Sequence, residues 1–154
     1  MILKIAGIVK ESVVDGPGLR YVIFTQGCPH NCVGCHNPKT HDFAGGYAIS
    51  TEELFQEITA TKLIDGVTFS GGEPFAQAAV CAELARLVKK QGLNVLTYSG
   101  YYYYELQKMA AKDSDVAALL HATDILIDGP YDETKKASNL EFRGSSNQSI
   151  IYLR

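Results

Sequence analysis

The sequence has no long hydrophobic run and no excess of positive charge. No apolar run approaches the roughly 18 residues that a membrane-spanning helix requires. The opening segment, MILKIAGIVKES, lacks the long apolar core and the small-residue cleavage site of a signal peptide. Lys and Arg number 14 against 17 Asp and Glu, so the formal charge of −3 gives no electrostatic footprint for nucleic acid or an anionic membrane. These absences predict a cytoplasmic protein that binds neither nucleic acid nor a membrane.

Internal repeats, low-complexity tracts and linkers are also absent. The chain has 154 residues, of which 46% are hydrophobic. This length suffices for one domain with a buried core, so we expect residues 1–154 to form a single domain.

Strand-like and helix-like segments alternate along the chain. DGPG, at residues 15–18, predicts a turn between the first two strands. Ser50, with Glu53 three residues later, predicts the start of a helix, and Gly92 predicts the end of another. A further helical stretch is expected to break at residues 113–115. Strands are predicted at residues 1–9, 19–27, 66–72, 93–100, 124–129 and 148–154, and helices after residue 50, at residues 76–91 and after residue 101.

This alternation predicts an α/β fold built from parallel βα units. The strands read as continuous apolar runs, which is typical of a sheet covered by helices on at least one face. A complete eight-fold βα barrel needs about 250 residues. We therefore expect a partial, open βα barrel of parallel strands, with a doubly wound sheet as the competing architecture.

Unusual residues follow four of the predicted strands directly. Cys28, Gly71–Glu73, Ser99–Gly100 and Asp128–Gly129 each come just after a strand. Ligands bind at the carboxyl ends of the strands in parallel α/β folds. We therefore expect these residues to meet in one site.

Three of the four cysteines lie in QGCPHNCVGCHN, residues 26–37, hereafter the cysteine loop. Cys28, Cys32 and Cys35 form a C-x3-C-x2-C pattern, whereas Cys81 lies in a predicted helix and is expected to be buried or half-buried. Spacing alone leaves a zinc site and an iron–sulfur site about equally favoured, with a smaller share for a thiol redox pair. Three thiolates on a [4Fe-4S] cube would leave one iron open for a substrate or cofactor.

The sequence resembles the radical S-adenosylmethionine family in two features. One is C-x3-C-x2-C after the first barrel strand, and the other is Gly71–Gly72–Glu73–Pro74, hereafter the GGEP loop. DGPGLRYVIFTQGCPHNCVGCHNP is similar to the start of glycyl-radical-enzyme activases. The short length, TYSGY, LIDGPY and RGSSNQ resemble the activating proteins of anaerobic ribonucleoside-triphosphate reductases.

The resemblance implies a role for each matching residue. It implies that the three clustered cysteines hold a [4Fe-4S] cluster, whose open iron binds S-adenosylmethionine. His30 and His36 flank these ligands in the sequence, where they are candidates to tune the cluster through hydrogen bonds. It implies that Asp15 seats the glycine loop of a partner protein, although a turn aspartate bonding its own backbone is an equal alternative. Arg143–Gln148 is expected at the mouth of the site or on the partner surface. The implied cofactor-binding residues are Gly34, Cys35 and His36 near the adenine, Gly71, Gly72 and Glu73 at the methionine end, and Ser99 at the ribose or carboxylate.

The implied function is that of a radical oxidoreductase. Reductive cleavage of S-adenosylmethionine would give a 5′-deoxyadenosyl radical, which generates a glycyl radical on an anaerobic ribonucleoside-triphosphate reductase. The implied partners are this reductase and a low-potential electron donor such as flavodoxin. The alternatives are an activase of a formate-lyase-type enzyme and, in a different class, a zinc-binding interaction domain.

Overall fold

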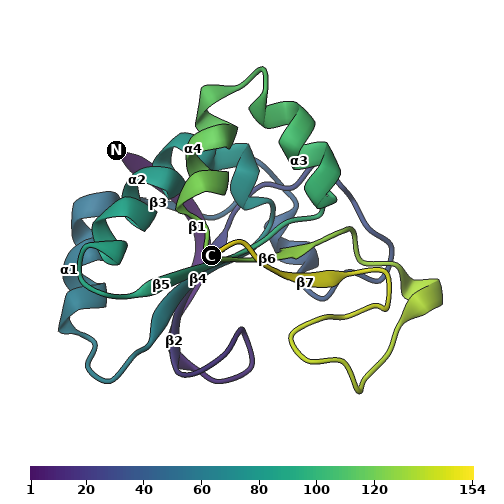
Figure 1. Cartoon of the computed structure of the whole chain (residues 1–154), viewed down its shortest axis with the longest axis horizontal. Helices are drawn as coiled ribbons and strands as arrows, with labels where there is room; N and C mark the ends of the chain where they lie inside the picture. Colours follow the sequence, from purple (N-terminus) through teal and green to yellow (C-terminus); the bar gives the residue numbers. More distant parts are fainter.

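A single mixed β-sheet runs through the computed structural model, which describes the whole chain from Met1 to Arg154 (Figure 1). Its seven strands lie in the order β3-β1-β2-β4-β5-β6-β7, so β3 and β7 form free edges and the sheet stays open. The strands are β1 (Ile2–Ser12), β2 (Arg20–Thr25), β3 (Tyr47–Ser50), β4 (Gly66–Gly71), β5 (Asn94–Tyr98), β6 (Ile125–Asp128) and β7 (Ser149–Tyr152). The helices are α1 (Thr51–Ala60), α2 (Ala78–Lys89), α3 (Tyr103–Ala110) and α4 (Ser114–Ala122).

The α/β class is confirmed, but the sheet is not parallel throughout. β2, β4, β5 and β6 pair in parallel. β1 is antiparallel to β2 and to β3, and β7 is antiparallel to β6. The link from β1 to β2 carries no helix, and a parallel pair needs a crossover of a dozen or more residues. The sequence pattern also gave no indication of β3, which is short.

The predicted helix boundaries correspond to observed caps. The Ser50 hydroxyl accepts a hydrogen bond from the Glu53 N–H at 3.1 Å at the start of α1. Gly92 has φ +84 after α2, a conformation that glycine adopts at helix ends. Asp113 caps α4 and separates it from α3, which confirms the predicted break.

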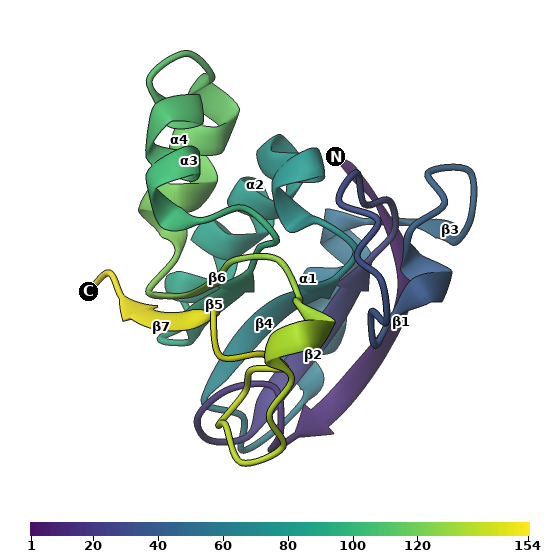
Figure 2. The same cartoon turned by 90° about the vertical axis from the view of Figure 1, so that its right-hand side faces the viewer.

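All four helices lie on one side of the sheet, as Figures 1 and 2 show. Leu54, Leu84 and Leu119 from these helices pack with Val67 and Phe69 of β4 in the main core. A doubly wound sheet would carry helices on both faces, so the partial-barrel prediction fits better. No helix is long and apolar enough to cross a membrane.

Loops rather than helices cover the opposite face of the sheet. The DGPG loop (residues 13–19) joins β1 to β2, and the β6–β7 segment (residues 129–148) joins the last two strands (Figure 2). On this face Leu96, Ile125 and Ile127 form a small cluster against Tyr98 and Phe142. Between the loops and the carboxyl ends of the parallel strands lies a cavity.

Candidate active site

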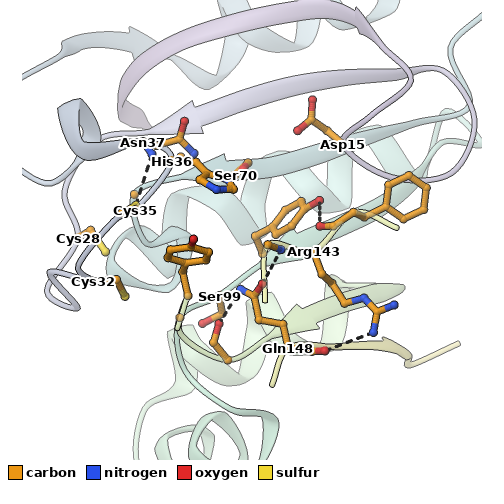
Figure 3. Close-up of a pocket in the computed structure, with 18 of the residues that line it drawn as sticks. Asp15, Cys28, Cys32, Cys35, His36, Asn37, Ser70, Ser99, Arg143 and Gln148 are labelled. Carbon is orange, nitrogen blue, oxygen red and sulfur yellow. Dashed lines mark hydrogen bonds between the residues drawn. The ribbon is translucent and has the colours of Figure 1, made fainter. Parts of the chain in front are cut away.

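The cavity has a volume of about 540 Å³ and contains every strand-end element that the sequence singled out. This size lies within the range of roughly 300–1,000 Å³ that is typical of small-molecule sites. Figure 3 shows the three clustered cysteines on one side of it, with Asp15 and Arg143 on the other. Its lining includes Asp15, Cys28, His30, Cys32, Cys35, His36, Ser70, Gly71, Gly72, Tyr98, Ser99, Gly100, Tyr131, Phe142, Arg143 and Gln148.

The three cavity cysteines are free and half-buried, whereas Cys81 is fully buried in α2. The Asn37 N–H donates to the sulfur of Cys35 at 3.4 Å. The backbones of His30 and Asn31 beside Cys28, and of Tyr131 beside Cys32, act to lower the pKa of these two thiols, although burial outweighs them. Such hydrogen bonds to cysteine sulfur are one of the features that set the potential of an iron–sulfur cluster.

Burial raises the pKa of the Cys28 and Cys32 thiols above the ordinary value. A half-buried thiolate is costly without a compensating cation. A bound metal group would supply that positive charge, and metal binding would therefore release protons from these thiols.

The donor set of the cavity fits an iron–sulfur cluster with three protein ligands. All three thiols line one cavity, and thiolates are the protein ligands that iron–sulfur clusters use. A cube carries an iron at each of several corners, so its thiolates do not need to converge on one point. The residues therefore fit a cluster bound through Cys28, Cys32 and Cys35.

The GGEP loop lies directly against the start of the cysteine loop. The N–H groups of Gly72 and Glu73 donate to the carbonyls of Thr25 and Gly27, both at 2.8 Å. Gly71 has φ +90, which a side chain would strain. A Cβ on Gly72 would overlap the carbonyl oxygen of Gly27. Glycine at these positions lets the two loops approach closely while leaving backbone exposed to the cavity.

Glu73 is fully buried and does not itself line the cavity. Its carboxylate accepts hydrogen bonds from the Gly100 N–H at 2.8 Å and the Phe75 N–H at 3.1 Å. The Ser99 hydroxyl donates to both of its oxygens at 3.1 Å. The carboxylate thus joins the loop after β4 to the loop after β5, and it contacts protein groups rather than open space.

Asp15 lines the cavity on the side opposite the cysteines. Its carboxylate accepts from the Ser12 hydroxyl at 2.6 Å. The carbonyl of Asp15 accepts from the Thr68 hydroxyl, which in turn accepts from Arg20 Nε. The Asp15 carboxylate is therefore held by the Ser12 side chain. It does not bond its own backbone, as an isolated turn aspartate would.

Arg20 is an organising residue that sequence reasoning missed. It is fully buried in β2, and its guanidinium also donates to the carbonyls of Pro17 and Val67, both at 3.0 Å. Burial lowers the pKa of Arg20 to about 10. The residue secures the DGPG loop against β4. The sequence signal that could have predicted a structural role for Arg20 was its position as a charged residue at the start of an apolar strand.

The β6–β7 segment closes the cavity on a second side. The Gln148 side chain accepts from the N–H groups of Gly144 and Ser145 and donates to the Gly129 carbonyl. The hydroxyl of Tyr98 donates to the Phe142 carbonyl at 2.7 Å. Arg143, Gly144 and Gln148 of the predicted stretch line the cavity.

The same segment touches the cysteine loop. The rings of Tyr131 and His36 lie 4.9 Å apart between centroids. Gly34 has φ +73 and packs on the side chain of Glu133. Gly34 therefore lies beside the cavity lining and not within it, unlike its neighbours Cys35 and His36.

The structure brings all but two of the predicted site residues to the cavity wall, the exceptions being Gly34 and Glu73. Tyr98 and Tyr131 also line the cavity, and neither was predicted there. Both occur in stretches quoted for the family resemblance, TYSGY and LIDGPY. Their positions at strand ends were the signal that could have found them.

Residues 14–151 match a family described as a 4Fe-4S single cluster domain. The chain belongs to this family. The family description names a [4Fe-4S] cluster, which is the group that the three cavity cysteines were predicted to hold. The match covers the DGPG loop, the cysteine loop and the GGEP loop together.

The sequence relatives of this 4Fe-4S single cluster protein include two kinds of activating enzyme. It is 33% identical over 146 residues, 90% of each chain, to the anaerobic ribonucleoside-triphosphate reductase-activating protein of Vibrio cholerae. It is 36% identical over 121 residues to the pyruvate formate-lyase-activating enzyme of Clostridium pasteurianum. That match covers 75% of this chain and spans about half of the relative, 51%. The resemblance to the radical S-adenosylmethionine activating proteins is confirmed.

The fold is also similar to that of a solved structure. QueE from Escherichia coli superposes with a TM-score of 0.52 at 21% identity, covering 65% of this chain and 53% of QueE. At that identity the likeness concerns the fold alone.

Proposed function

We propose that this protein activates an anaerobic ribonucleoside-triphosphate reductase by generating a glycyl radical on it. The observation that carries the proposal is the alignment over 90% of both chains with a protein of that name. The cavity supports it, because three free thiols and the glycines of the GGEP loop line one space of small-molecule size.

Each site residue has a role that its position supports. Cys28, Cys32 and Cys35 would hold the [4Fe-4S] cluster. When bound, the cluster supplies one electron that cleaves S-adenosylmethionine into methionine and the 5′-deoxyadenosyl group that removes hydrogen from a glycine. Gly71 and Gly72 would present backbone carbonyls to the methionine ammonium, which donates hydrogen bonds but accepts none.

The remaining roles concern the outer parts of the cofactor. Cys35 and His36 would face the adenine, with Gly34 shaping the loop behind them. Ser99 would contact the ribose or carboxylate through its backbone, because its hydroxyl is taken by Glu73. Glu73 would order the methionine end indirectly, from its buried position.

The protein partner would enter from the side of Asp15 and Arg143. The open sheet leaves this side of the cavity without a further βα unit. We propose that the reductase completes the wall there and excludes water from the reacting groups. Flavodoxin or a similar low-potential protein would supply electrons, and a cytoplasmic, single-domain protein fits these partners.

The test is anaerobic reconstitution with iron and sulfide, followed by incubation with the reductase, S-adenosylmethionine and a reductant. We expect a brown protein, a cluster spectrum that changes on addition of S-adenosylmethionine, and a glycyl radical signal on the reductase. A colourless protein that binds one zinc tightly and ignores S-adenosylmethionine would contradict the proposal and favour an interaction domain.

A second candidate is activation of pyruvate formate-lyase, favoured by the 36% identity to an enzyme of that name. That alignment leaves about half of the relative unmatched. The two candidates separate when each purified partner is offered under the same conditions. A glycyl radical on the lyase and none on the reductase would replace the first proposal with the second.

A further inference from the structure

His30 occupies an unusual position between two cluster cysteines. It lies two residues from both Cys28 and Cys32, and its side chain is only 15% exposed. Its Nε2 lies 2.5 Å from Oε1 of Glu73, which is completely buried. The contact joins the cysteine loop to the GGEP loop through side chains.

The direction of this hydrogen bond follows from the other partners of Glu73. Oε1 already accepts from the Gly100 N–H, and Oε2 accepts from the Phe75 N–H. The carboxylate oxygens therefore act as acceptors, and the ring nitrogen of His30 donates. Bonds to a charged acceptor are stronger than those between neutral groups.

The protein also provides a shaped space for the His30 ring. The ring packs edge-on against Tyr101, with centroids 4.5 Å apart and an interplanar angle of 76°. A Cβ on Gly100 would overlap the His30 ring, so only glycine leaves room for it. Three loops, after β2, β4 and β5, thus meet at one imidazole.

Between the first two cysteines of the cysteine loop, residues 29–31 form no backbone–backbone hydrogen bond. The backbone of the loop is anchored before this point, where Gly27 and Cys28 donate to the carbonyls of Thr40 and His41. Asn31 has φ +51, so the chain reverses directly after His30. The side chain of His30 is therefore what holds this turn against the buried carboxylate.

We propose that His30 is a positioning residue that keeps the cluster at a fixed distance from the methionine end of S-adenosylmethionine. The inference rests on the proposed function, because it assumes that the cavity binds both groups. Its effect is on geometry: the three cysteines suffice to bind the cluster, and His30 sets where the cluster lies relative to the GGEP loop.

Three substitutions separate the hydrogen bond from the packing. His30→Phe fills the same space without a donor. His30→Gln places an amide nitrogen the same number of bonds from Cβ as Nε2, whereas His30→Asn is one bond too short. The measurements are iron and sulfide content, the dissociation constant of S-adenosylmethionine, and the change that it causes in the paramagnetic resonance spectrum of the reduced cluster.

We expect His30→Phe to keep a full cluster and to bind S-adenosylmethionine roughly tenfold more weakly, from the loss of one bond to a charged group. The spectral change should be diminished, His30→Gln should restore both readouts, and His30→Asn should not. In the cluster-free protein, amide exchange across residues 28–35 should be faster in His30→Phe than in His30→Gln.

Two results would overturn the proposal. One is an unaltered dissociation constant and spectral change in His30→Phe. The other is loss of the cluster itself, which would make His30 an assembly residue. If His30→Phe does not fold, Gly100→Ala displaces the same ring and should weaken S-adenosylmethionine binding equally. Because binding and spectra are read without a partner, failure to activate either reductase or lyase would leave this test intact.

Discussion

Replacing Gly72 by alanine should separate the GGEP loop from the cysteine loop. The new Cβ would lie 2.9 Å from the carbonyl carbon of Gly27 and 3.0 Å from the carbonyl oxygen of Thr40. Carbon atoms pack at about 3.5–4.0 Å, so the two backbones must move apart by about 0.6 Å or more. Both obstructing groups are backbone, and no side chain can rotate away to relieve the overlap.

This displacement should lower the rate of S-adenosylmethionine cleavage strongly and the free energy of unfolding only moderately. Overpacking costs about 1–3 kcal/mol, so the variant should still fold. A misplacement of about 1 Å at reacting groups can lower a rate about a hundredfold. We therefore expect Gly72→Ala to cleave S-adenosylmethionine between about tenfold and a hundredfold more slowly, with the cluster retained.

The assay is anaerobic formation of 5′-deoxyadenosine by the reconstituted protein with a chemical reductant, normalised to bound iron. Gly7→Ala is the matched control, since a Cβ there meets nothing within 4 Å. Equal rates for Gly72→Ala and Gly7→Ala, at equal iron content, would refute the argument that close loop approach sets the geometry of the site.

Three further predictions concern the cysteines, the buried arginine and alkaline pH. In the native, cluster-free protein, alkylation followed by mass spectrometry should label the three half-buried thiols and spare Cys81, whose pKa is raised by complete burial; Cys81→Ala should keep its cluster, and rapid labelling of Cys81 would contradict the assignment. Arg20→Met should lower the free energy of unfolding by about 2–4 kcal/mol in urea titrations, because buried carbonyls lose their donor, whereas Lys10→Met, which removes an exposed ion pair, should cost at most about 1 kcal/mol. Burial, with Asp15 adding to it, raises the pKa of Tyr98 above its ordinary value of about 10. The folded state then holds this proton more tightly, so the contribution of Tyr98 to stability is present below about pH 10 and is lost as the pH rises further. Unfolding free energies measured from about pH 9 to about pH 11.5 should fall less steeply in Tyr98→Phe, and parallel slopes would count against the assignment.

Sequence patterns located most of the secondary structure, because turns, caps and helix ends are set by residues close together in the sequence. The turn at DGPG, the cap at Ser50, the glycine stop at Gly92 and the break at Asp113 each depend on residues a few positions apart. Such signals are readable without the fold. The antiparallel pairing of β1 with β2, and of β6 with β7, was missed although the segment that joins each pair carries no α-helix, which was the available signal.

Residue types and spacing by themselves determined the donor set of this protein. Three thiols at C-x3-C-x2-C, and two glycines at the end of β4, carry their chemistry in any fold that exposes them at a strand end. The tertiary structure alone decided how these parts are held. Glu73 is buried and accepts a hydrogen bond from His30, although the two residues are 43 positions apart in the sequence. They meet because β2 and β4 pair in parallel, which brings the loops that follow these strands together. A hydrogen bond of that kind leaves no periodicity or local motif in the sequence. Its two partners lie in loops that come into contact only when the sheet has formed.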